Sequence, residues 1–127
     1  MSARSIQFAI ASVFFVLGGW ALFLPQSVID LTIRPEFVSG SDFERFAVAC
    51  FGAQALISGL FAAFARFTRT TFLAYGIALL PFLAFNYWFF VVEPVLTAIG
   101  LLDLVGNVVM LGLCVLGYRA AGTERPA

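Results

Sequence analysis

Four long apolar stretches dominate this chain of 127 residues. They cover residues 6–24, 43–65, 71–92 and 95–118, and short segments with charged residues or Pro separate them. A helix needs roughly 20 apolar residues to cross about 30 Å of hydrocarbon, and each stretch is close to that length. The stretches do not alternate polar with apolar residues, as the strands of a membrane barrel do. The sequence therefore predicts an all-α protein, with residues 1–127 forming a single transmembrane domain, an integral membrane four-helix transmembrane bundle.

The composition excludes several classes of protein. Hydrophobic residues make up 62% of the chain and charged residues 11%, whereas a soluble domain has about 45–50% and 25%. So much apolar surface does not fit inside one small core, which excludes soluble enzymes and nucleic-acid binders. The sequence has no His, and its two Cys, Cys50 and Cys114, are far apart. We therefore expect no catalytic residues, no metal site and no cofactor.

The distribution of charge predicts an orientation. With four spans, the N-terminus, the middle loop and the C-terminus lie on one side of the membrane. That side carries five Arg and one acid: Arg4, Arg66, Arg69, Arg119, Arg125 and Glu124. The opposite side is richer in acids: Asp30, Arg34, Glu36, Asp42 and Glu93. Cytoplasmic loops carry an excess of Lys and Arg, so both termini are predicted to be cytoplasmic.

Residues 25–42 form the one long connection, and they mix apolar with charged side chains. We expect this outer loop to lie in the headgroup region, either as a lid or docking surface or as a plain linker. At its end, Ser41 and Glu44 match the Ser-x-x-Glu capping box. This motif predicts that Ser41 caps the second span and that Glu44 bonds back to the Ser41 amide.

Four polar side chains inside the spans form the candidate site. Asp103, Asn107, Asn86 and Gln54 all fall in the outer half of the membrane, where polar groups are costly and usually functional. Asp103 and Asn107 are four residues apart and share a helix face. Asp103 is expected to be either protonated and bonded to an Asn side chain, or ionised and paired with Arg45. The cluster would then act as a structural staple, as a ligand or ion site, or as a contact with another subunit.

Small residues recur along the second span at Gly52, Ala55, Gly59 and Ala63. Such series let two helix backbones approach closely in a membrane. The second span is therefore predicted to pack along another helix, either in the same bundle or in another chain.

The sequence also shows a family resemblance. Pro25 ends the first span, the interfacial loop follows, Glu44-Arg45-Phe46 opens the second span, and Gly52 comes after it. This order resembles a group of small bacterial four-helix integral membrane proteins of unknown function. The resemblance implies four helices in a bacterial inner membrane, and it implies no activity.

Two functions from different classes are compatible with these features. The first is a non-catalytic accessory or scaffold subunit that packs against a larger membrane complex, such as a respiratory or light-harvesting assembly. The alternative is a small transporter or a lipid-binding or small-molecule-binding membrane protein with its site around Asp103. The expected partners are membrane lipids and other membrane subunits or further copies of this chain, and not nucleic acid. A cavity that reaches Asp103 would favour the alternative, whereas a tightly packed pair of Asp103 with Arg45 would oppose it.

Overall fold

The computed structural model describes residues 1–123, which leaves the predicted charges at Glu124 and Arg125 outside the described residues. In that range the chain forms α1 (Ala3–Phe23), α2 (Pro25–Thr32), the 3-10 helix η1 (Pro35–Phe37), α3 (Asp42–Phe64), α4 (Arg69–Tyr87), the π-helical turn η2 (Trp88–Val92) and α5 (Leu101–Thr123). Four segments are long and apolar enough to cross a membrane: α1, α3, α4 together with η2, and α5. The all-α class and the four apolar spans are thus confirmed, and residues 1–123 contain no sheet.

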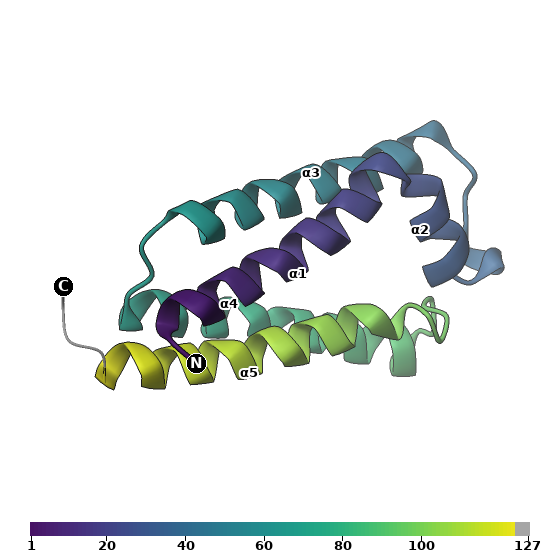
Figure 1. The fold of residues 1–127 in the computed structure, drawn as a ribbon. Helices are drawn as coiled ribbons and strands as arrows, with labels where there is room; N and C mark the ends of the chain where they lie inside the picture. The colour runs from purple at the N-terminus through teal and green to yellow at the C-terminus, as the bar shows by residue number, and fades with distance from the viewer. Residues whose placement is uncertain (124–127) are drawn as a thin grey trace.

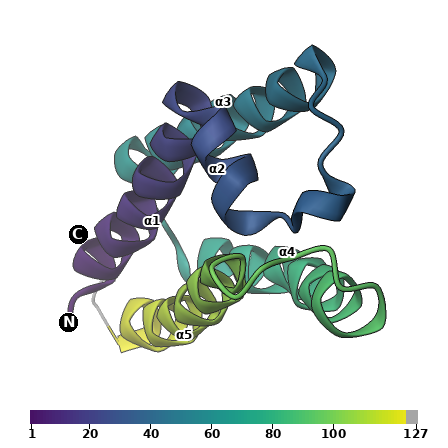
Figure 2. The ribbon, with the colours of Figure 1, turned by 90° about the vertical axis from the view of Figure 1, so that its right-hand side faces the viewer.

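The long helices are arranged as two pairs (Figure 1). Helix α3 packs along α1, α5 packs along α4, and α1 also contacts α5. The start of α1 and the end of α5 lie together at one end of the molecule, which we name the terminal end. Helix α2 and the connection between α4 and α5 lie at the opposite end, which we name the α2 end. Viewed from there, the two pairs diverge and α2 lies between them (Figure 2).

The pair α1–α3 depends on the small residues of α3. A Cβ added to Gly52 would lie 2.3 Å from the Leu22 backbone nitrogen and 2.7 Å from the Gly18 carbonyl oxygen. A Cβ on Gly59 would lie 3.1 Å from Phe14 Cβ. Only glycine permits this approach, so the helix that the small-residue series was predicted to contact is α1 of the same chain.

The fourth span begins at Leu101, later than the predicted residue 95. Residues 93–100 instead form a connection that bonds to the end of α2. Arg34 N donates to the Val95 carbonyl at 2.8 Å, and Thr97 N donates to the Thr32 carbonyl at 2.8 Å. Thr97 Oγ1 donates to the Leu31 carbonyl at 2.5 Å. The outer loop is therefore attached to the α4–α5 connection, and we name this set of bonds the latch.

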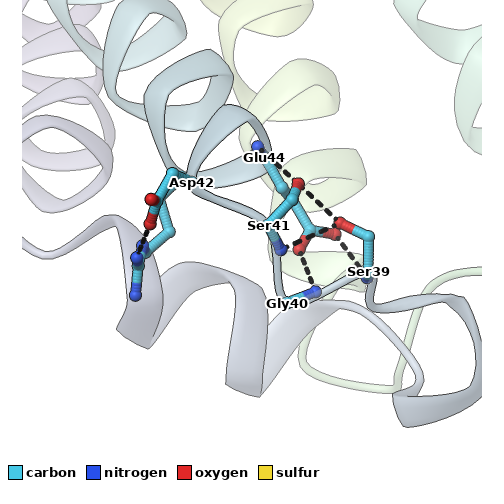
Figure 3. A network of polar contacts seen from close by, with 6 residues as sticks. Ser39, Gly40, Ser41, Asp42 and Glu44 are labelled. Atoms are coloured by element: carbon cyan, nitrogen blue, oxygen red, sulfur yellow. Dashed lines mark hydrogen bonds and ion pairs between the residues drawn. The ribbon is translucent and has the colours of Figure 1, made fainter.

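The start of α3 confirms half of the predicted capping box (Figure 3). Ser41 Oγ accepts a hydrogen bond from Glu44 N at 3.2 Å, as predicted. The Glu44 carboxylate reaches further back, to Ser39 N at 3.3 Å and Gly40 N at 3.1 Å, rather than to the Ser41 amide. Gly40 has a φ of 70°, and this turn aims both amides at the carboxylate.

A buried amide that the sequence analysis did not single out holds the other end of α3. Gln7 of α1 is 2% exposed. Its Nε2 donates to the carbonyls of Ala62 at 2.6 Å and Ala65 at 2.5 Å, and its Oε1 accepts from Phe67 N at 3.4 Å. Carbonyls at a helix C-terminus lack partners within the helix. Gln7 supplies those partners, so this polar residue in the first span has a structural role.

Candidate functional site

A cavity of about 790 Å³ lies between the two helix pairs. All five α-helices contribute to its wall, and Thr32, Ile33, Val95 and Leu96, at or next to the latch, line it at the α2 end. The wall is mostly apolar and aromatic; its larger side chains include Phe14, Leu17, Trp20, Phe51, Tyr75, Phe82, Phe85, Phe89 and Met110. This volume and lining match the usual pocket for a small organic molecule, about 300–1,000 Å³ with few polar groups.

The cavity is open on the side where α3 faces α4. These two helices do not form an extensive contact, although residues of both line the cavity. Phe51 on α3 and Phe85 on α4 are each 55% exposed. On the side where α1 meets α5, by contrast, the lining residues Gly106 and Met110 are partly or fully buried. The cavity is therefore least covered between α3 and α4.

Asp103 lies on the cavity wall, in the first turn of α5. One of its carboxylate oxygens, Oδ2, accepts hydrogen bonds from Asn86 Nδ2 at 2.7 Å and from Asn107 Nδ2 at 3.0 Å. Asn86 and Asn107 are buried, at 4% and 8% exposed, while Asp103 itself is exposed. The N-terminus of a helix carries a partial positive charge. The two amides and the helix end are thus favourable surroundings for a negative charge.

The two Asn side chains have no donor left for a ligand. Asn86 Nδ2 also donates to the Phe82 carbonyl at 2.9 Å, and Asn107 Nδ2 also donates to the Asp103 carbonyl at 2.9 Å. An amide nitrogen has two hydrogens, so both amides are fully used. Asn86 Oδ1 is buried without a hydrogen-bond partner in the described part of the chain. The unused hydrogen-bonding capacity of the cluster therefore consists of acceptors.

The structure brings together three of the four polar side chains predicted to form the site. Asp103, Asn86 and Asn107 form the cluster just described, which we name the carboxylate cluster. Gln54 also lines the cavity, but from α3, and it makes no hydrogen bond to the cluster. Arg45 does not belong to the site.

Of the two alternatives for Asp103, the hydrogen bonds to Asn side chains are present and the ion pair with Arg45 is not. Arg45 pairs with Asp42, one turn away on the same helix, and this is the only ion pair among residues 1–123. Both side chains are largely exposed at the α2 end, with 48% and 92% exposure. A partner three residues away on the same helix is within easy reach, and Arg45 does not line the cavity.

The site also contains residues that the sequence analysis missed. Trp20 of α1 lines the cavity and donates its Nε1–H to Ser27 Oγ of α2 at 3.1 Å. Tyr75 and Phe82 of α4 line it as well. Aromatic residues are ordinary in a membrane span, so only the divergence of the two helix pairs shows which of them face the cavity.

Among residues 1–123, no group of three His, Cys, Asp or Glu side chains lies close enough to hold a metal ion. Cys50 and Cys114 are free, the first exposed and the second buried. Comparison of the chain with protein-family models, curated proteins and solved structures finds no significant match.

Proposed function

We propose that this chain is a membrane protein that binds a lipid-soluble small molecule or lipid in the cavity between its two helix pairs. Among residues 1–123, Asp103 is the only charged side chain on the mostly apolar cavity wall, and its position carries the proposal. A polar group at membrane depth is costly unless it serves packing or function. The carboxylate cluster joins α4 to α5 within one helix pair, and it leaves Asp103 exposed on the cavity wall. We therefore assign the carboxylate cluster the role of binding a ligand in the cavity.

The charge distribution supports an orientation for this binding protein. The terminal end carries Arg4, Arg66, Arg69 and Arg119 without an acid among the described residues, whereas the acids gather at the α2 end. By the positive-inside rule, the terminal end faces the cytoplasm and the cavity lies toward the outer leaflet. The bacterial inner membrane is the location that the sequence resemblance implies. We place the protein there, with both termini cytoplasmic.

The accessory-subunit hypothesis takes second place. The small-residue series of α3 was the surface that could pack against another chain, and helix α1 of the same chain covers it. Phe82, Phe85 and Phe89 of α4 and η2 line the cavity. The exposed apolar residues elsewhere, such as Phe43 and Phe64, are what contact with lipid requires.

Filling the cavity tests the proposal. Ala78 lines the cavity on α4, whereas Ala74, one turn earlier on the same helix, is exposed and does not line it. The probe is a long-chain alcohol brominated in mid-chain, which quenches Trp fluorescence on contact. In nanodiscs, the Trp88→Phe protein reports quenching of Trp20 alone, because the chain has two Trp.

We expect Ala78→Phe to reduce quenching of Trp20 several-fold and Ala74→Phe to leave it unchanged. The Trp20→Phe protein keeps Trp88, which does not line the cavity, and so measures quenching by probe in the surrounding bilayer. Equal quenching of Trp20 and Trp88 in the unfilled protein would refute binding in the cavity. Purification of the native protein as a fixed component of a larger complex would instead favour the accessory role.

A further inference from the structure

We infer that the ligand of this cavity is a cationic amphiphile, an apolar molecule that carries an amine. This inference rests on the proposed function and adds the chemical class of the ligand. It follows from three features of the wall: the acceptors left unused by the carboxylate cluster, the absence of positive charge, and the apolar character of the remaining surface.

The hydrogen-bonding capacity of the carboxylate cluster selects a donor. Both amide nitrogens, on Asn86 and Asn107, already donate two hydrogen bonds each. Asp103 Oδ1 accepts no hydrogen bond from the described residues and belongs to the exposed member of the cluster. A ligand with a carbonyl, phosphate or carboxylate head would meet acceptors only. An ammonium group brings several donors, and a hydroxyl group brings one.

The charge on the wall favours the ammonium over the hydroxyl group. Among residues 1–123, no Arg lines the cavity, and Arg45 is paired with Asp42. Within that range the Asp103 carboxylate therefore has no counter-ion. A charge away from water is costly unless it is paired and hydrogen-bonded, and a bound ammonium would supply both the charge and the hydrogen bonds. A hydroxyl group would also form a charge-assisted hydrogen bond to the carboxylate, but it would leave the negative charge uncompensated.

The geometry of the cavity fits the apolar part of such a molecule. The carboxylate cluster lies at the α2 end, whereas Tyr75, Leu79 and Met110 extend the apolar wall toward the middle of α4 and α5. An amphiphile that enters between α3 and α4 would place its head at Asp103 and its tail along this wall. The anionic headgroup of a phospholipid would instead face the carboxylate, and so we exclude anionic lipids as the specific ligand.

The test compares two probes that differ only in the head group. A long-chain alkylamine and the alcohol of equal chain length, both brominated in mid-chain, are titrated into nanodiscs of zwitterionic lipid that contain the Trp88→Phe protein. Quenching of Trp20 is corrected for probe in the bilayer with the Trp20→Phe protein. We expect the amine to quench Trp20 at a concentration in the bilayer about tenfold or more below that of the alcohol.

Two substitutions then assign the preference to one carboxylate. Asp103→Asn should remove the preference for the amine while binding of the alcohol persists, which also shows that the cavity is intact. Glu93→Gln removes an exposed acid at the same end that does not line the cavity, and it should leave the preference unchanged. Equal affinity for both probes in the Trp88→Phe protein would overturn the inference and leave the proposed function in place. Absence of quenching by either probe beyond that of Trp88 would overturn both.

Discussion

The contact between α1 and α3 at Gly52 leads to the sharpest prediction on stability. A methyl group at position 52 would lie 2.3 Å from Leu22 N, 2.7 Å from Gly18 O and 2.8 Å from the Ala21 carbonyl carbon. Atoms at rest are about 3.5 Å apart or more, so the shortest of these contacts is about 1.2 Å too close. All three neighbours are backbone atoms of α1, which have no rotamer to change. The substitution Gly52→Ala must therefore push the two helices apart.

The matched control is Gly19→Ala, because a Cβ at Gly19 of α1 has no neighbour within 4 Å. Both substitutions gain the same helix propensity, about 1 kcal/mol, and this gain cancels when the variants are compared. Overpacking costs about 1–3 kcal/mol. We expect Gly52→Ala to be less stable than Gly19→Ala by at least that amount, since movement of a whole helix also loses contacts along the pair.

Unfolding of both variants in detergent, followed by circular dichroism against increasing SDS, measures this difference. The midpoint of Gly19→Ala should lie at or above that of the unchanged protein, and the midpoint of Gly52→Ala well below it. Equal midpoints for the two variants would refute the close packing of α1 on α3 and the role assigned to the small-residue series.

Three further predictions concern single contacts. Gln7→Leu should destabilise the protein by about 1–3 kcal/mol in the same assay, because it removes buried hydrogen bonds to the end of α3. The control Gln54→Leu removes no observed side-chain hydrogen bond and should change stability by much less. Gly40→Ala should cost about 1–2 kcal/mol, since an L-residue adopts the observed φ of 70° at that cost; a neutral effect would contradict the turn. Arg45→Gln should change stability by less than about 1 kcal/mol, as expected for an exposed ion pair. It should also leave binding at Asp103 unchanged. A large loss of stability or of binding would instead support a pair of Arg45 with Asp103.

The sequence was sufficient to predict the spans because their signal is local. Length and hydropathy set where a helix crosses the bilayer, and the spacing of Asp103 and Asn107 places both on one helix face. The start of the fourth span was misplaced because residues 95–100 are as apolar as a span. Their backbone bonds to residues 32–34, and a contact so distant in sequence leaves no local pattern.

The partners of the polar residues were harder to predict. The depth of Asn86 in its span correctly predicted that it lies near Asp103. Depth alone also suggested Gln54, which lies on the other helix pair. Arg45 was one of two possible partners for Asp103, because a charge in a membrane needs a partner; the carboxylate of Asp42, three residues from Arg45, was not considered. The role of Gln7 could not be predicted, because its partners are main-chain groups, which every residue has.

The cavity itself raises the last question, which is what fills it in the membrane. The cavity wall is mostly apolar, and apolar surface left in water is unfavourable. In a bilayer, the proposed opening between α3 and α4 would admit the tails of neighbouring lipids. A lipid tail satisfies the apolar wall but leaves the Asp103 carboxylate without a counter-ion. A molecule with the same tail and an ammonium head would cover the apolar wall and also pair with the carboxylate. The ligand that we infer should therefore displace a lipid tail from the cavity.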